Sequence, residues 1–139
     1  MQYRELGAAG LKVSAVGLGT WAIGGWLWGG SDRQAAVAAV QAAVEAGITL
    51  IDTAPGYGLG LAEEIVGEAL AGLRDKVVLA TKCGLVWHVR HELEESLRRL
   101  ATDRIDLYQT HWQDATTRSR NPWASWRNSA GRARSARSE

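Results

Sequence analysis

Four side chains in this 139-residue sequence could together deliver a proton to a substrate: Asp52, Tyr57, Lys82 and His111. They stand at or just beyond the ends of predicted β-strands, in the segments DTAPGYG, VVLATK and DLYQTHW. An ammonium beside a phenol stabilises the phenolate and lowers the pKa of a tyrosine from about 10. A carboxylate would hold that lysine, and an imidazole would orient a carbonyl. This combination predicts a site that reduces a C=O group.

The elements that would carry these residues alternate between strands and helices. The pattern predicts a β-hairpin over residues 3–14 and a strand over 15–19. A helix should begin with a capping box formed by Ser31 and Gln34, and the buried strand 48–52 should follow it.

The alternation continues through the second half of the regular region. A helix is predicted over 61–73, then the apolar strand 77–81. Apolar residues recur at helical spacing over 89–100, and the strand 104–110 follows. The order is therefore β-α-β-α-β-α-β after the hairpin.

Such alternation favours parallel strands joined by right-handed crossovers. Catalytic groups at the carboxyl ends of several strands are typical of a (β/α)₈ TIM barrel, and an open doubly wound sheet is the alternative. Four βα units are half a barrel, since a complete one takes about 250 residues. The expected fold is thus an α/β half barrel with two bare sheet edges and exposed apolar surface on its would-be interior.

Composition predicts one soluble domain. The chain is 46% apolar and 22% charged, as ordinary globular domains are. Its longest apolar run is interrupted by Lys12 and many glycines, and no signal peptide is evident, so a cytoplasmic location without membrane association is expected. Cys83 is the single cysteine, which excludes an intrachain disulfide.

Charge divides the chain into a body and a tail. Residues 118–139 hold six arginines and one glutamate, whereas residues 1–117 are net negative. We therefore predict one domain over 1–117 and an arginine-rich irregular tail over 118–139.

The motifs resemble those of the aldo-keto reductase family, particularly its bacterial and potassium-channel-β-subunit-like branches. YRELGAAGLKVSAVGLGTWAIGG resembles the opening hairpin and first strand, and GITLIDTAPGYG resembles the aspartate–tyrosine motif. VVLATKCG resembles the lysine strand, and LEESLRRLATDRIDLYQTHW resembles the helix and strand that deliver the histidine. The resemblance covers the amino-terminal half of the family's barrel.

The resemblance implies an NADPH-dependent reductase of aldehydes or ketones that needs no metal. Tyr57 would be the general acid, Lys82 and Asp52 its partners, and His111 the group that orients the substrate. The nicotinamide end of the cofactor would lie near four residues: Gly19, Thr20, Trp21 and Asp52. Most other cofactor contacts would come from the missing half, so weak binding and negligible turnover are expected of this chain alone.

The residue types in the tail are those expected when GC-rich coding DNA is translated out of frame. With permitted codons, reading residues 118–138 from the third base of the Arg118 codon can give IEEPLGELAELRRAGKIRAIG, an aldo-keto reductase-like continuation. Trp123 and Trp126 each force Leu, Met or Val in that frame, three positions apart as a helical core requires. We hypothesise a frameshift, either genuine or a sequencing error.

Several weaker signals have structural alternatives. Gly17, Gly19 and Ala22 fit G-x-G-x-x-A, but no helix follows directly, which disfavours a dinucleotide fingerprint. The tryptophans at 21, 26 and 28 could line an apolar substrate pocket or pack over the barrel mouth.

Two further signals concern metal binding and redox chemistry. His88 and His91 stand three apart on a predicted helix, where a solvated face is a simpler reading than a metal pair. Cys83 is expected to be a small residue at the rim rather than a redox sensor.

Two other classes of function compete with the reductase. One is a non-catalytic half barrel that self-associates through its edges or acts as a regulatory subunit. The other is nonspecific nucleic-acid binding through the arginine tail, which we disfavour.

Overall fold

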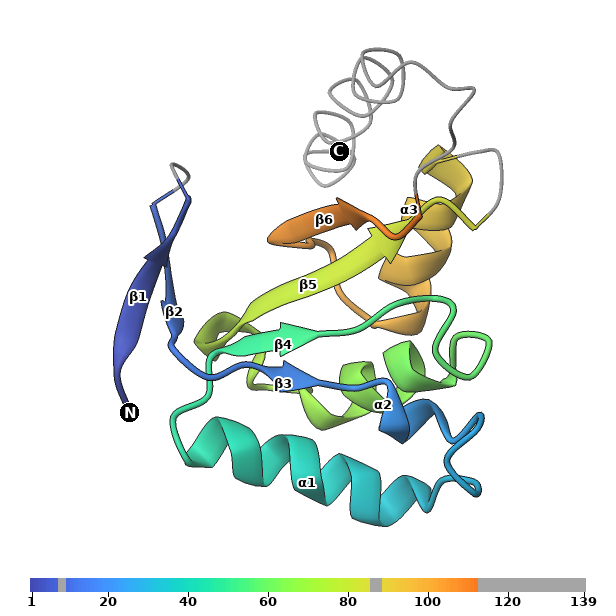
Figure 1. Cartoon of the computed structure of the whole chain (residues 1–139), viewed down its shortest axis with the longest axis horizontal. Coiled ribbons are helices and arrows are strands. Elements are labelled where there is room, and N and C mark those ends of the chain that lie inside the picture. Colours follow the sequence, from blue (N-terminus) through green and yellow to red (C-terminus); the bar gives the residue numbers. More distant parts are fainter. Residues whose placement is uncertain (8–9, 86–88, 113–139) are drawn as a thin grey trace.

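An antiparallel hairpin precedes a parallel sheet in the computed structural model, which describes residues 1–7, 10–85 and 89–112. The hairpin pairs β1 (Tyr3–Leu6) with β2 (Leu11–Ser14). It lies at the amino-terminal ends of the sheet strands (Figure 1). The predicted hairpin is therefore confirmed.

Four parallel strands form the sheet in their order along the chain. They are β3 (Leu18–Gly19), β4 (Leu50–Asp52), β5 (Val78–Cys83) and β6 (Leu107–Thr110). A doubly wound sheet would reverse its strand order at a switch point, and the described strands contain no such reversal. Consecutive neighbours are instead what part of a (β/α)₈ barrel requires.

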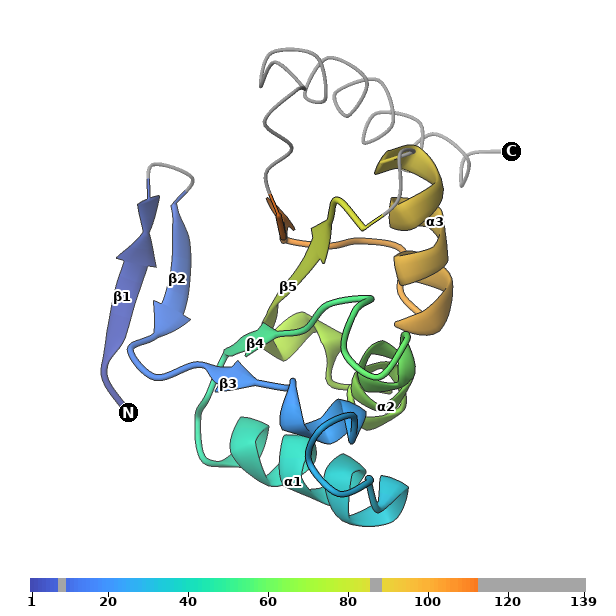
Figure 2. The same cartoon turned by 45° about the vertical axis from the view of Figure 1, so that its right-hand side comes forward.

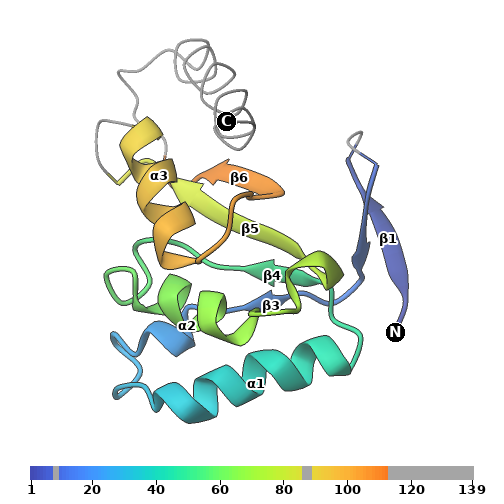
Figure 3. The same ribbon diagram turned by 180° about the vertical axis from the view of Figure 1, so that it is seen from behind.

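Three helices cover one side of this sheet (Figure 2), as the view from behind also shows (Figure 3). They are α1 (Arg33–Glu45), α2 (Leu61–Ala69) and α3 (Val89–Arg99). Two short 3₁₀ turns, η2 (Ala22–Gly24) and η3 (Arg74–Lys76), lie in the connections. The predicted alternation of strands and helices is thus present in the described residues.

The details of two helices differ from the predictions. Asp32, not Ser31, caps α1, because its carboxylate accepts a hydrogen bond from the Ala35 amide at 3.0 Å. The second helix ends at Ala69 rather than near residue 73. Leu73 nevertheless packs against the core from the turn that follows.

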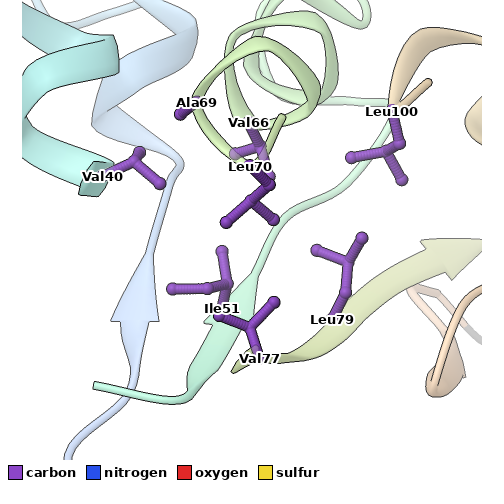
Figure 4. Close-up of a cluster of buried hydrophobic side chains, with 8 residues drawn as sticks. All are labelled: Val40, Ile51, Val66, Ala69, Leu70, Val77, Leu79 and Leu100. Atoms are coloured by element: carbon purple, nitrogen blue, oxygen red, sulfur yellow. The ribbon is translucent and has the colours of Figure 1, made fainter. Parts of the chain in front are cut away.

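The main core lies between the helices and the sheet. Ile51 of β4 and Leu79 of β5 meet side chains of α1 and α2 and the residues that flank them (Figure 4). The buried members of this cluster are Val40, Ile51, Val66, Ala69, Leu70, Val77, Leu79 and Leu100. The hydrophobic effect acting on these residues holds the helical layer against the sheet.

A second, smaller core lies beneath α3 and contains Cys83, Leu93 and Tyr108. Cys83 is therefore buried, and our expectation that it stands at the rim is wrong. Burial and the Glu92 carboxylate raise the pKa of its thiol. A buried thiol with a raised pKa has little thiolate to react, so Cys83 serves packing.

The pleat of the strands decides which side chains face away from the helices. Ile51 and Leu79 point toward the helices, so their neighbours Leu50 and Val78 point to the other face. Leu50 and Val78 are half-buried rather than fully open. In the described residues β3 pairs only with β4, and β6 only with β5, so both edges lack a further strand there.

No helix among the described residues has the length and apolar character needed to cross a membrane.

Candidate active site

The Lys82 ammonium lies at the centre of the proposed site. Its Nζ atom donates to both Asp52 carboxylate oxygens, at 2.9 and 2.8 Å, and to the Thr53 carbonyl at 2.9 Å. The Tyr57 hydroxyl lies 3.2 Å from the same nitrogen. Three of the four predicted catalytic residues are therefore in direct contact.

The strands bring this group together from two parts of the sequence. Asp52 is the last residue of β4 and pairs with Ala80 of β5. Lys82 lies two residues beyond Ala80 and therefore on the same face, pointing away from the helices. Parallel strands end at the same edge of a sheet, so the two charged side chains meet there.

Tyr57 lies on the loop that joins β4 to α2, where backbone contacts fix it. Its amide donates to the Ala54 carbonyl at 3.1 Å, and its carbonyl accepts from the Ala62 amide at 3.2 Å. The Lys82 nitrogen lies 4.9 Å from the centre of the Tyr57 ring. The phenol is thus held with its hydroxyl toward the ammonium.

A second loop packs directly against this one through two glycines. A Cβ added to Gly24 would lie 2.6 Å from the Tyr57 carbonyl carbon, and one added to Gly58 would lie 2.2 Å from the Gly24 oxygen. No side chain fits between backbones this close. Gly24 therefore supports the Tyr57 loop, a role that the sequence analysis did not find.

His111 follows β6 and completes the predicted set. Its amide donates to the Cys83 carbonyl at 2.8 Å, and its ring meets the Tyr57 ring edge-on at a centroid distance of 5.7 Å. Burial and the Lys82 charge lower its pKa, against a smaller opposing effect of Asp52. The neutral imidazole that results has one donor and one acceptor nitrogen.

The His111 Nδ1 atom is buried and has no hydrogen-bond partner among the described residues. A buried polar atom without a partner is costly in a folded protein and calls for an explanation. In this respect His111 differs from Lys82, whose Nζ atom contacts four oxygen atoms.

The residues predicted to hold a cofactor lie beside the same group. Gly19 pairs with Asp52 in the sheet, and a Cβ placed on Gly19 would meet no atom within 4 Å. Trp21 is 48% exposed, and its ring lies 6.4 Å from that of Tyr57. Thr20 differs, because it is fully buried and its hydroxyl donates to the Asp52 carbonyl at 3.0 Å.

Exposed aromatic rings continue from the site in two directions. Trp28 meets Trp21 edge-on at 5.6 Å, and Trp112 meets His111 at 5.8 Å. Trp112 is 70% exposed and was missed by the sequence analysis, although it directly follows His111. Apolar rings around a few polar groups are typical of a small-molecule site.

The remaining sequence signals concern metal binding and the arginine-rich tail. The described residues contain no cluster of three or more His, Cys, Asp or Glu side chains that could hold a metal ion. His88, part of the loop before α3 and the predicted tail over 118–139 lie outside the described residues.

Comparison with known proteins identifies the family. A sequence model of the aldo/keto reductase family matches residues 15–128. The chain belongs to the aldo/keto reductase family. The match extends beyond Thr117, where the sequence analysis predicted the boundary of the domain.

Bacterial reductases are among the similar curated proteins. Aldo-keto reductase YhdN of Bacillus subtilis (strain 168) is 51% identical over 128 residues, which cover 82% of this chain and 39% of YhdN. The NADH-specific methylglyoxal reductase of Escherichia coli (strain K12) is 44% identical, with 81% of this chain and 42% of the relative covered. The chain therefore spans about two fifths of the length of these relatives.

Solved structures agree on the fold. A holo-form aldo-keto reductase from Bacillus halodurans matches with a TM-score of 0.85 and 31% identity, covering 96% of this chain and 47% of that one. An enzyme from Klebsiella pneumoniae in complex with NADPH matches with a TM-score of 0.70 and 42% identity. The match covers 82% of this chain and 41% of that enzyme. The four-stranded sheet is thus part of the (β/α)₈ barrel of this family.

Proposed function

We propose that this chain supplies the proton-donating half of an NADPH-dependent reductase that converts aldehydes or ketones to alcohols. The observation that carries the proposal is the Lys82 ammonium, which contacts both the Asp52 carboxylate and the Tyr57 hydroxyl. Family membership and the exposed aromatic rings around the site support it.

Tyr57 would act as the general acid. Its hydroxyl proton passes to the carbonyl oxygen of the substrate, and Lys82 stabilises the phenolate that remains. Asp52 holds Lys82 in place through two hydrogen bonds. The neutral His111 ring would donate to the same carbonyl oxygen and fix its direction.

A reduced nicotinamide would supply the hydride that reaches the carbonyl carbon. Gly19, Trp21 and Asp52 would lie nearest to it, because the space beside Gly19 is open and Trp21 stands exposed next to Tyr57. Thr20 would contribute by fixing the backbone, since its hydroxyl is already bonded to the Asp52 carbonyl.

NADPH is the proposed cofactor because a Klebsiella pneumoniae relative was solved with it, although the Escherichia coli relative is named NADH-specific. By itself the chain should bind either cofactor weakly and show negligible turnover, because it covers only about two fifths of these relatives. A fluorescence titration with NADPH and NADH tests this, and micromolar affinity of the chain alone would contradict it.

A hybrid protein tests the reductase activity itself. Residues 1–112 joined to the remaining carboxyl-terminal part of YhdN should oxidise NADPH in the presence of a small aldehyde such as methylglyoxal. The Tyr57→Phe hybrid, which keeps the ring and removes the proton, is the matched control. A folded hybrid that does not reduce any of a panel of aldehydes and ketones would reject the proposal.

A second candidate function is non-catalytic: a half barrel that oligomerises or acts as a regulatory subunit. The observation that favours it is that β3 and β6 each lack a second neighbouring strand among the described residues. Unpaired edges readily pair with another chain. Size-exclusion chromatography with light scattering distinguishes a defined dimer from a monomer or an aggregate.

Three further expectations concern the protein's context. We propose a cytoplasmic protein that binds neither membrane nor nucleic acid, which cell fractionation and retention assays on RNA and DNA would test. The tail over 118–139 stays a predicted frameshift product. Genomic DNA whose shifted frame lacks the continuation IEEPLGELAELRRAGKIRAIG would contradict that hypothesis.

A further inference from the structure

A fully buried carboxylate lies behind the site, on the helix side of the sheet. Glu63, in the first turn of α2, accepts a hydrogen bond from the Thr81 hydroxyl at 2.7 Å through Oε1. Its other oxygen, Oε2, accepts from Arg99 Nε at 2.6 Å. One carboxylate therefore joins α2, β5 and α3.

The residues that Glu63 joins are sequence neighbours of the site. Thr81 directly precedes Lys82 in β5, so their side chains point to opposite faces of the strand. Glu63 stands in the helix whose preceding loop carries Tyr57. The Thr81–Glu63 hydrogen bond thus connects, on one face, the same two segments that Lys82 and Tyr57 connect on the other.

Arg99 holds the third side of this arrangement. It is the last residue of α3, and its side chain is 15% exposed and also lies 3.5 Å from the Glu95 carboxylate. It passes so close to Gly60, at the start of α2, that a Cβ there would lie 2.6 Å from Arg99 Cδ. The Arg99 side chain therefore packs directly against the end of the Tyr57 loop.

Burying ionic groups between a helix and a strand carries a desolvation penalty. Apolar residues of similar size often stabilise the fold as well or better. Hydrogen bonds, unlike apolar contacts, impose a direction and a distance. We propose that Glu63, together with Thr81 and Arg99, is a positioning residue that fixes the Tyr57 hydroxyl relative to the Lys82 ammonium. Its catalytic meaning rests on the proposed function, whereas its structural effect can be measured without turnover.

Side-chain NMR on the full chain tests the proposal. The sequence has three tyrosines and three histidines, so ¹³C labelling of these rings gives few signals, and Tyr57→Phe assigns the one that matters. Thr81→Val keeps the shape of the side chain and removes its donor. We expect it to shift the ring signals of Tyr57 and His111, and Thr81→Ser, which restores the hydroxyl, to return them to the wild-type positions.

The matched control is a similar link at the other end of β5. Asp106 Oδ2 accepts from Arg74 at 2.7 Å and from the Leu79 amide at 2.8 Å. Asp106→Asn should lower stability without moving the Tyr57 and His111 signals. Equal shifts in Asp106→Asn and Thr81→Val would overturn the proposal, because the effect would then be general loosening.

A second variant, Glu63→Gln, tests the same proposal if Thr81→Val fails to fold. Glu63→Gln retains an acceptor for Thr81 but loses the ion pair with Arg99, and it should also shift the Tyr57 signal. Wild-type Tyr57 and His111 signals in every folded variant of Glu63 and Thr81 would overturn the proposal. An inactive hybrid enzyme combined with shifted signals would instead reject only the reductase function.

Discussion

The two ends of the parallel sheet use their polar groups in opposite ways. At the amino-terminal end, Arg74 donates to four acceptors, and the Asp106 carboxylate also receives the Leu79 amide. At the carboxyl-terminal end, His111 Nδ1 has no partner among the described residues. Satisfied hydrogen bonds stabilise a fold, whereas a buried polar atom without a partner costs stability and calls for an explanation such as a functional role.

The hairpin adds to the contrast. Ser14 and Thr49 exchange hydrogen bonds, with the Ser14 amide donating to the Thr49 hydroxyl at 2.8 Å and the Thr49 amide donating to the Ser14 hydroxyl at 2.9 Å. These bonds attach the hairpin beside the start of β4. Exposed tryptophans surround the opposite end instead. One end of the sheet therefore carries stabilising hydrogen bonds, and the other carries the proposed active site.

The largest expected effect is on catalysis at the carboxyl end. In the YhdN hybrid, Tyr57→Phe should lower kcat by about 10²-fold to 10⁴-fold, because the general acid is lost. Its urea denaturation midpoint should stay close to that of the parent hybrid. The rate of NADPH oxidation at saturating aldehyde measures kcat. A kcat that Tyr57→Phe leaves unchanged would mean that another group donates the proton.

At the amino-terminal end, substitutions should change the stability of the fold rather than catalysis. Asp106→Ala leaves Arg74, which is only 15% exposed, without its carboxylate, and should reduce the free energy of unfolding by about 3 kcal/mol. Asp75→Ala removes a far more exposed carboxylate from Arg104 and should change the free energy of unfolding much less. Urea denaturation of both variants makes the comparison, and equal effects would show that burial at this end does not matter.

A smaller effect is expected where two loops meet. Gly24→Ala places a methyl group 2.6 Å from the Tyr57 carbonyl carbon, so the loops must separate at a cost of about 1 to 3 kcal/mol. Ala22→Ser, at an exposed position in the same turn, is the control. The Tyr57 ring signal should move in the first variant only.

The smallest effect concerns pH. Because the pKa of His111 is lowered below 6.5, the unfolded chain binds this proton more readily than the folded one. The contribution of His111 to stability is therefore complete above pH 6.5 and decreases as the pH falls through and below that value. A His111→Asn variant should lose this part of the pH dependence.

An NMR titration gives the matching test on the cause of the His111 shift. Lys82→Met removes a positive charge that lowers the pKa of His111, so that pKa should rise toward its ordinary value. No rise would mean that burial alone lowers it.

Much of the architecture could be predicted because it depends on local patterns. Turn residues and apolar periodicity located the hairpin, the helices and the strands, with errors at their ends such as the cap at Asp32 and the end of α2. The four candidate catalytic residues could be named because each lies at or beyond the carboxyl end of a predicted strand. Cys83 was placed wrongly: alternation along the strand puts it on the face opposite to Lys82, where it packs beneath α3.

By itself the sequence determined the order of the elements, the parallel sheet and the residue types available at its carboxyl end. Only the tertiary structure decided that Lys82 contacts both Asp52 and Tyr57, that Gly24 supports the Tyr57 loop, and that Glu63 lies buried between Thr81 and Arg99. The physical reason is range: periodicity and turns act between residues a few positions apart, whereas these contacts join residues 18 to 36 positions apart in the chain. Strand register and helix packing bring such residues together.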